Sequence, residues 1–437
     1  MIPLAVAGLA LAAWAYLLLG RGFFWRCAER DDPRRVGNAN ALPTAARIRP
    51  ALVGPHHHAS HGPPPPSATG EDQGRSADPP PRSGGGGERS EPEGAHVVAI
   101  IPARNEAETI ATAVSALLAQ DYPSERLRVI VVDDQSSDGT AALAQGAGGS
   151  TGRVEVVAGT PLPAGWTGKV WAMAQGVRRA SETEPVPAYI LFQDADIAFD
   201  PGVISSLVAT ARAQNAILLS LMAKLRCDSP AEKLLVPAFV FFFQKLYPFA
   251  WVNDPESRTA AAAGGCMLVR ADALAAAGGL AAIRSAIIDD CALARLLKPH
   301  GPIRLGLTHS VTSLRPYPKL GDIRRMVGRS AYAELRYSPW RLAGTVAGMA
   351  IIYLAPPLLA VFARGLPQIL GGAAWLAMTL AYLPMLRFYR RSPLWAPLLP
   401  VAAGLYTAFT LDSAFQHWRG RGGAWKGRYQ AAAERAR

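Results

Sequence analysis

Hydrophobic residues form long unbroken runs at the two ends of the chain and only short runs between them. The first long run is Ile2–Leu19, which contains no charged residue and is about long enough to span a bilayer. Three more runs follow near the other end, at 342–363, 366–386 and 394–411. We therefore predict a membrane anchor over residues 1–27 and two or three membrane segments over residues 341–412.

A cleavable signal peptide is the alternative reading of the first run. No basic stretch precedes it, however, and residues 20–25 form a poor cleavage site. A retained anchor is the favoured interpretation. The runs at 342–363 and 366–386 are separated by little more than Arg364 and Gly365, which predicts a membrane hairpin.

Arginines predict the orientation, because basic residues accumulate on the cytoplasmic side of a membrane. Five arginines follow the first run and five precede the second: Arg21, Arg26, Arg30, Arg34, Arg35, Arg324, Arg325, Arg329, Arg336 and Arg341. The region between the spans is thus expected in the cytoplasm. If 394–411 crosses fully, the basic tail at 413–437 lies outside, so a re-entrant or interfacial segment is kept as the alternative.

Residues 28–95 lose all periodicity and are filled with proline, glycine, serine and charge. Such a segment buries too little apolar surface to offset its ordering entropy, and we predict a disordered tether. The histidines at 56–58 and 61 are interpreted as incidental. The net charge of +12 invites a nucleic-acid partner, but the arginines gather beside membrane segments, which favours anionic lipid head groups.

Between these regions, short apolar runs alternate with helical patterns. Strands are predicted at 97–102, 127–132, 153–157 and 189–192, and helices at 106–119, 137–147 and 170–179. This alternation predicts an α/β fold with a mainly parallel sheet flanked by helices. In such sheets ligands bind beyond the carboxyl ends of the strands.

Three acidic or polar motifs follow strands at that edge, at 104–106, 133–134 and 194–196. Asp194 and Asp196 are two residues apart, so both carboxylates can face one point and hold a divalent cation that also contacts phosphates. A solvated turn is the alternative. Asp133 and Asp134 can accept from a nucleotide base or ribose, or cap the next helix.

Lys169 stands beside a glycine at a predicted helix start, where it either contacts phosphate or is a solvated loop lysine. The chain has no Gly-rich dinucleotide motif after its first strand and no P-loop. Neither a dinucleotide cofactor nor ATP in a P-loop is therefore indicated.

A second group of motifs follows later in the chain. Gly264 and Gly265 allow close backbone approach to a ligand. Asp289 and Asp290 follow two isoleucines and open a helix, so one acid can cap it while the other serves as a general base. Their repulsion raises one pKa toward a useful value. The four cysteines show no paired spacing, so neither structural zinc nor disulfides are expected.

With these motifs in order over residues 96–340, the chain resembles the family-2 glycosyltransferases, whose nucleotide-sugar-binding domain has the GT-A fold. It is most similar to the hopene-associated glycosyltransferases of bacterial hopanoid gene clusters. That closer likeness lies in the stretches 237–244, 247–254 and 425–428 and in the membrane-flanked layout.

The resemblance implies an inverting, metal-dependent transfer from a nucleotide-diphosphate sugar to a hopanoid-like lipid at the bacterial inner membrane, without nucleic acid. Asp290 would be the catalytic base. The donor would be bound by Asn105, Glu106, Asp133, Asp134, Lys169 and Asp194. The metal, Mg²⁺ or Mn²⁺, would be held by Asp194 and Asp196. The residues on the acceptor side would be Gly264, Gly265 and Asp289.

The chain departs from the family pattern in two places. Asp289 stands where the family usually has glutamate, and the Gln-x-x-Arg-Trp motif of processive polymer synthases is absent, which argues against polymer synthesis. A polyprenyl-phosphate glycosyltransferase and a non-catalytic nucleotide-sugar-binding protein are the alternatives. The apolar, aromatic segment 234–252 is expected to lie at the bilayer surface beside a lipid acceptor; a core helix or a fifth membrane segment are the other possibilities.

Overall fold

The computed structural model describes residues 1–31, 95–423 and 426 of the 437-residue chain. Most of the predicted tether, the four clustered histidines and nearly all of the basic tail beyond residue 423 therefore lie outside the described residues. The anchor, the α/β domain and the apolar helices near the C-terminus are described in full.

The α/β domain is built on one eight-stranded sheet with the order β3-β2-β1-β4-β7-β6-β8-β5. Its strands are β1 (Val97–Ala103), β2 (Leu127–Asp133), β3 (Val154–Ala158), β4 (Tyr189–Gln193), β5 (Ile197–Phe199), β6 (Leu218–Lys224), β7 (Cys266–Arg270) and β8 (Ile303–Ser313). The first four strands are parallel, as expected. The other half makes the sheet mixed, because β7 is antiparallel to β4 and β6, and β5 is antiparallel to β8.

The helices of this domain lie between the strands, except for the last two, which follow β8. They are α2 (Ile110–Leu118), α3 (Thr140–Gly148), α4 (Gly168–Ser181), α5 (Val203–Ala213), α6 (Pro230–Leu246), α7 (Phe249–Asn253), α8 (Ala271–Ala276), α9 (Asp289–Leu297), α10 (Leu320–Gly328) and α11 (Ala331–Glu334), with short 3₁₀ turns at 124–126, 280–283 and 298–300. The predicted helices at 106–119, 137–147 and 170–179 are present as α2, α3 and α4, with shifted ends.

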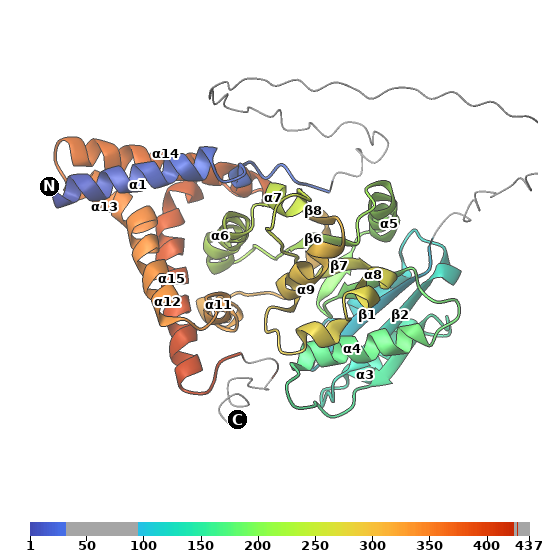
Figure 1. Cartoon of the computed structure of the whole chain (residues 1–437). Helices are drawn as coiled ribbons and strands as arrows, with labels where there is room; N and C mark the ends of the chain where they lie inside the picture. Colours follow the sequence, from blue (N-terminus) through green and yellow to red (C-terminus); the bar gives the residue numbers. More distant parts are fainter. Residues whose placement is uncertain (32–94, 424–425, 427–437) are drawn as a thin grey trace, which may run out of the picture. The chain divides into compact units, whose positions relative to one another are not determined.

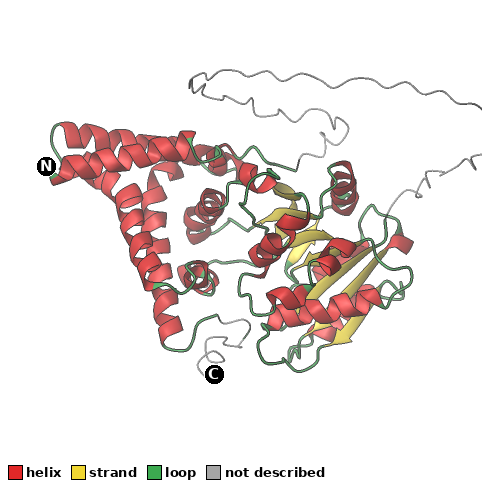
Figure 2. Cartoon of the chain, in the orientation of Figure 1, coloured by secondary structure: helices red, strands yellow, loops and turns green. Residues whose placement is uncertain are grey.

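The sheet separates two apolar clusters, and helices cover both of its faces (Figure 2). Residues of β1 alternate between them: Ile100 joins one cluster and Ile101 the other, as the period of a strand requires. Helices α2 and α5 pack on the Ile101 face, while α4, α6 and α9 pack on the Ile100 face. The strands with both faces covered are thus the continuous apolar runs seen in the sequence.

Four helices are long and apolar enough to cross a membrane among the residues described: Ile2–Leu19 (α1), Pro339–Phe362, Leu366–Phe388 (α14) and Pro393–Trp418. Pro339–Phe362 comprises α12 (Pro339–Met349), a π-helical turn η6 (Ala350–Leu354) and α13 (Ala355–Phe362), and Pro393–Trp418 comprises the 3₁₀ turn η7 (Pro393–Leu398) and α15 (Leu399–Trp418). Figure 1 shows α1 beside α14, and α12 beside α15 running across their direction. The predicted hairpin corresponds to α13 and α14, which pack on each other.

Helix α6 joins the α/β domain to these apolar helices. The side chains of Leu235 and Phe241 are fully buried, and Tyr406 of α15 donates a hydrogen bond to the Leu235 carbonyl at 2.8 Å. Phe242 packs edge to face on Tyr353 of η6. The segment 234–252 is therefore a core helix followed by a short turn of helix, rather than the surface-lying element that we favoured, because helices distant in sequence cover its aromatic side chains.

Gly176 allows α4 to lie close on the sheet, and this close approach generates a stability prediction. A Cβ at position 176 would collide with Cγ2 of Ile100, whereas a Cβ at Gly146 of α3 meets nothing within 4 Å. We expect Gly176→Ala to lower the free energy of unfolding by about 1–3 kcal/mol through overpacking. Gly146→Ala, the matched helical control, should raise it by about 0.5–1 kcal/mol. Thermal unfolding of both purified variants in detergent measures the difference, and equal midpoints would contradict the close packing.

Candidate active site

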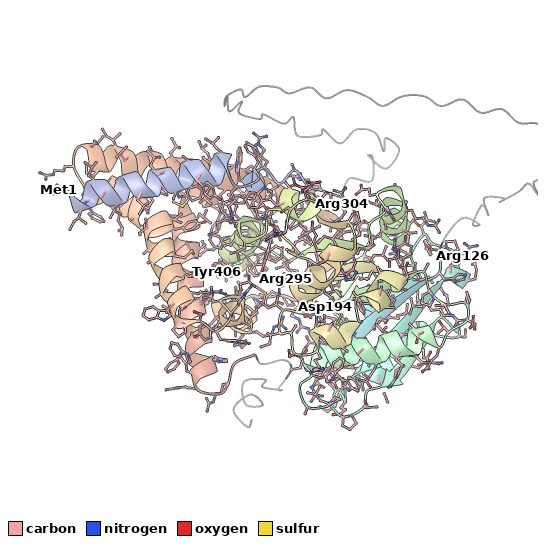
Figure 3. The ribbon with its side chains drawn as sticks, in the orientation of Figure 1. Met1, Arg126, Asp194, Arg295, Arg304 and Tyr406 are labelled. Atoms are coloured by element: carbon pink, nitrogen blue, oxygen red, sulfur yellow. The ribbon has the colours of Figure 1, made fainter. Side chains whose placement is uncertain are left out.

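Acidic side chains from three segments of the domain meet at the carboxyl end of the parallel strands. Asp194 and Asp196 follow β4, Glu106 follows β1, and Asp289 and Asp290 open α9. Figure 3 labels Asp194 among the side chains of the domain. The structure thus brings together motifs that lie up to 184 residues apart, as the sheet-edge argument predicts.

The ammonium of Lys169 connects two of these segments. Its Nζ lies 2.8 Å from Oδ1 of Asp194 and 3.1 Å from Oδ2 of Asp289. Burial lowers the pKa of Lys169, but the two carboxylates raise it more, so the net direction is upward. Lys169 is therefore not the solvated loop lysine of the alternative reading; it is a charged residue held in the first turn of α4.

Asp290 is held by backbone donors on the other side of Lys169. Its Oδ2 accepts from the Gly264 amide at 2.9 Å, and its Oδ1 accepts from the Cys291 amide at 2.7 Å. Burial and the charge of Asp289 raise the pKa of Asp290 to about 6. A carboxyl group with this pKa is mostly ionised at neutral pH and remains basic enough to accept a proton.

The two predicted glycines have different surroundings. A Cβ at Gly264 would lie 3.2 Å from Lys169 Nζ, closer than most such contacts, and 3.4 Å from Asp290 Oδ2. Gly265 instead faces Ile197 and Ala223 within the core. Asp289, which we expected on the acceptor side, is directed to Lys169 and so belongs with the Asp194 group.

Asp196 and Glu106 are joined by Arg315, which follows β8. Arg315 Nε lies 2.8 Å from Asp196 Oδ2, and its NH2 lies 2.5 Å from Glu106 Oε2. The other oxygen of Glu106 is 2.9 Å from Nζ of Lys426, which also donates to the Asn105 carbonyl. Both oxygens of Glu106 are thus occupied by cations from distant parts of the chain.

The loops after β1 and β2 are fastened to each other. Asn105 has a left-handed backbone with φ of 51°, its amide donates to Ser136 Oγ at 2.9 Å, and its Oδ1 accepts from the Ser137 amide at 3.0 Å. Asn105 therefore shapes the edge where a nucleotide would lie.

The two adjacent aspartates after β2 differ in exposure. Asp134 is completely buried, with one carboxylate oxygen 3.6 Å from Arg104 NH1. Asp133 is partly exposed and accepts weakly from the Ser136 amide at 3.4 Å, while its Oδ1 has no hydrogen-bond partner in the described part of the chain. Of the two predicted nucleotide-binding acids, Asp133 is thus the one that is accessible from solvent.

A pocket lies beside Lys169 and Asp289. Its remaining lining residues are Thr167, Ala286, Ile287, Arg329 and Gly423. It is lined from the α/β domain and also from the segments that lead to and from the apolar helices, since Arg329 follows α10 and Gly423 follows α15.

The acidic residues suit a hard divalent cation through their charge. The carboxylates of Glu106, Asp194, Asp196, Asp289 and Asp290 outnumber the three cations that contact this group, namely Lys169, Arg315 and Lys426. Burial and neighbouring carboxylates raise the pKa of Asp194, although Lys169 opposes the shift. Among the residues that the structure describes, no three His, Cys, Asp or Glu side chains form a preassembled ion site. Mg²⁺ and Mn²⁺ commonly need only one or two carboxylates when phosphates supply other ligands, and Asp194 and Asp196 fit that requirement.

Arg315 and Lys426 are the site residues that the sequence reasoning missed. Neither belongs to a periodic pattern, and each lies in a loop far in sequence from Glu106. The stretch 425–428 had been singled out only as part of the closer family likeness, which was the one available signal for Lys426.

The raised pKa of Asp290 predicts a pH-dependent cost in stability. In the unfolded chain its pKa returns to about 3.8, so the folded state binds more protons between pH 4 and 6 and stability falls as pH rises through that window. We expect the free energy of unfolding of the wild type, relative to Asp290→Asn, to fall by about 1 kcal/mol from pH 5 to pH 7. Unfolding of both proteins in metal-free detergent buffer measures this, and a constant difference would exclude the raised pKa.

Comparison with known proteins supports a family assignment for the part of the chain that carries most of these residues. Residues 98–276 match the model of glycosyl transferase family 2. The match includes Asp133, Lys169, Asp194 and Asp196, and it ends before Asp289 and Asp290.

Over 61 residues the chain is 46% identical to the succinoglycan biosynthesis protein ExoU of Rhizobium meliloti (strain 1021). This alignment covers 14% of the chain and 17% of that protein, so the chain spans about a sixth of the relative's length.

Among solved structures, the chain is similar to the mannosyltransferase PcManGT from Pyrobaculum calidifontis in complex with GDP-Man and Mn²⁺. The identity is 17% and the TM-score is 0.46, and the match covers 74% of this chain and 86% of that one. It is also similar to S. aureus TarS 1–349 in complex with UDP-GlcNAc, at 13% identity and a TM-score of 0.36, covering 74% of this chain and 92% of that one. The family match thus extends over residues 98–276 of the 437-residue chain.

Proposed function

We propose that this chain is a membrane-bound inverting glycosyltransferase that moves a sugar from a nucleotide-diphosphate sugar to a hydroxyl group of a lipid. One observation carries the proposal: a partly buried carboxylate with a raised pKa, Asp290, lies beside the Lys169–Asp194 ion pair at the carboxyl edge of the sheet. The first group suits a general base, and the second suits a diphosphate leaving group. The family 2 domain supports the same reaction class.

The donor would lie along the carboxyl ends of β2, β1 and β4. Asp133 offers its accessible carboxylate to a base or ribose donor, and Lys169 lies in the first turn of α4, where its charge and the backbone amides favour a diphosphate. Asp194 and Asp196 would hold Mg²⁺ or Mn²⁺, which would offset the charge of the departing nucleoside diphosphate.

The transfer is a single displacement. Asp290 accepts the proton of the acceptor hydroxyl, whose oxygen forms a bond to the anomeric carbon of the sugar. The bond from that carbon to the diphosphate oxygen breaks on the opposite face, and the electron pair leaves with the nucleoside diphosphate. The anomeric centre is therefore inverted, and no covalent enzyme intermediate is needed.

The four long apolar helices support a lipid acceptor and a place in the bacterial inner membrane, with the α/β domain in the cytoplasm. The arginine-rich segments beside the first two spans favour this orientation. By resemblance, the lipid is a hopanoid-like molecule and the pathway is hopanoid biosynthesis. A polyprenyl phosphate is the alternative acceptor, but its attacking oxygen is already anionic and needs no base, so the partly buried Asp290 favours a hydroxyl.

Replacing the proposed base tests the reaction. We expect Asp290→Asn to lower kcat by about 10²–10⁴-fold and to leave nucleoside-diphosphate affinity within about twofold, because the side chain acts on the acceptor proton. The assay follows sugar transfer from UDP- and GDP-sugars into lipid extracts by mass spectrometry. Asp272→Asn is the matched control, since Asp272 opens α8 at the other end of β7, and it should retain wild-type activity. Full activity of the Asp290→Asn variant would refute the assignment of Asp290 as the general base. If the wild type transfers sugar only to polyprenyl phosphate, the acceptor is a phosphate and not a lipid hydroxyl.

The pH dependence of the rate provides a second test. Because Asp290 must be ionised to accept a proton and its pKa is about 6, kcat/KM should rise with pH up to about 6 and level off above it. A phosphate acceptor titrates in the same range, with a second pKa of about 6. The Asp290→Asn variant distinguishes these two sources of the pH dependence. Its residual activity loses the dependence on pH if ionisation of Asp290 causes it, and keeps the dependence if ionisation of a phosphate acceptor causes it.

A further inference from the structure

We propose that Arg315 and the divalent cation are alternative partners of Asp196, and that the diphosphate of the donor takes over Arg315 when the metal binds. The inference rests on the proposed function, since it requires a nucleoside diphosphate at this edge of the sheet. It assigns to Arg315 a role that none of the sequence motifs indicates.

The first step is the position of the guanidinium. Arg315 contacts Asp196 through Nε and Glu106 through NH2, while NH1 has no partner in the part of the chain that the structure describes. The Arg315 side chain is 32% exposed, and the carboxylates of Asp196 and Glu106 are 16% and 13% exposed. These pairs are largely shielded from water, so they attract more strongly than surface pairs do.

The second step is competition. Arg315 Nε lies 2.8 Å from Oδ2 of Asp196, so the guanidinium already offsets the charge of that carboxylate and uses one of the oxygens that a divalent cation would contact. If the metal displaces Arg315 from Asp196, Glu106 still holds the guanidinium through NH2, and the displaced cation stays close to the metal. Two like charges then repel each other unless an anion comes between them.

The third step identifies that anion. A diphosphate has oxygens for a metal and for a planar guanidinium at once, and arginine binds phosphate through paired N–H donors. NH1 and the second N–H of NH2 of Arg315 form such a pair, and Nε can donate as well once it is released from Asp196. Metal alone should therefore bind weakly, because it has to displace the Arg315 guanidinium and then lies close to it. Metal and nucleoside diphosphate should strengthen each other's binding, because the diphosphate offsets the repulsion between the metal and Arg315.

The experiment titrates the full-length protein in detergent with Mn²⁺ alone, followed by electron paramagnetic resonance, and then with Mn²⁺ in the presence of saturating UDP or GDP. We expect Arg315→Gln to bind Mn²⁺ alone at least tenfold more tightly than the wild type does. In the same variant, nucleoside diphosphate should raise Mn²⁺ affinity at least tenfold less than in the wild type. A loss of structure in the variant would weaken Mn²⁺ binding both with and without nucleotide. Tighter binding of Mn²⁺ alone, together with a smaller effect of nucleotide, therefore identifies competition.

Arg270→Gln is the matched control. Its side chain is 35% exposed, it pairs with Asp272 at 2.6 Å, and it lies at the end of β7 that adjoins the start of β4, away from Asp194. Both Mn²⁺ affinities should match the wild type. Arg315→Lys provides a conservative variant whose single ammonium can contact one carboxylate at a time, so its Mn²⁺ affinity without nucleotide should fall between those of the wild type and Arg315→Gln.

The outcomes separate this inference from the proposed function. If the wild type binds UDP or GDP with Mn²⁺ but Arg315→Gln binds Mn²⁺ alone no more tightly than the wild type, the competition is refuted and the function stands. If the wild type binds neither nucleotide in the presence of Mn²⁺, the proposed function fails and the inference fails with it. If Arg315→Gln does not fold, unchanged Mn²⁺ binding by Arg315→Lys refutes the competition.

Discussion

The ammonium of Lys169 lies between two carboxylates that come from different parts of the domain, Asp194 after β4 and Asp289 at the start of α9. Without this cation, the partly buried carboxylates would be neighbours with little to offset their repulsion, and burial of unpaired charge costs several kcal/mol. The position of α9, and with it that of Asp290, therefore depends on a residue from the first turn of α4. Gly264 leaves room for the same ammonium, because a Cβ there would lie 3.2 Å from Lys169 Nζ.

The apolar helices and the sheet share a single core. Val98 and Ile100 of β1 belong to the same cluster of buried residues as Trp14 of α1 and Met378 of α14, and α6 lies between them. The apolar helices therefore pack on the side of the sheet that carries α4 and α9. A polar contact strengthens this attachment, since Tyr406 of α15 donates to the Leu235 carbonyl of α6 at 2.8 Å. The pocket beside Lys169 receives Arg329 and Gly423 through the same attachment.

The parts of the fold that sequence reasoning predicted are those in which local pattern and burial agree. Strands β1, β2 and β4 are buried on both faces and stand out as apolar runs, and Asp194 follows such a run directly. Strands β6 to β8 escaped notice, because their pairing is long-range and β8 alternates irregularly between buried and partly exposed residues. Adjacent aspartates cannot be ranked from sequence, and only the structure shows that Asp134 is buried. Arg315 and Lys426 could not be predicted either, since no local rule brings residues 315 and 426 to Glu106.

The shared core also determines which shortened fragments of this protein can fold. The family match ends at residue 276, yet β8 is hydrogen-bonded into the sheet and α9 carries Asp290, so the matched segment is not a folding unit. A longer fragment that stops before α12 would contain the whole sheet but would present the aromatic side of α6 to water, and exposed apolar patches of that kind promote aggregation. Detergent that covers the apolar helices would therefore also border the core beneath the candidate active site. If the proposed function holds, the choice of detergent affects the transfer reaction as well as the solubility of the protein.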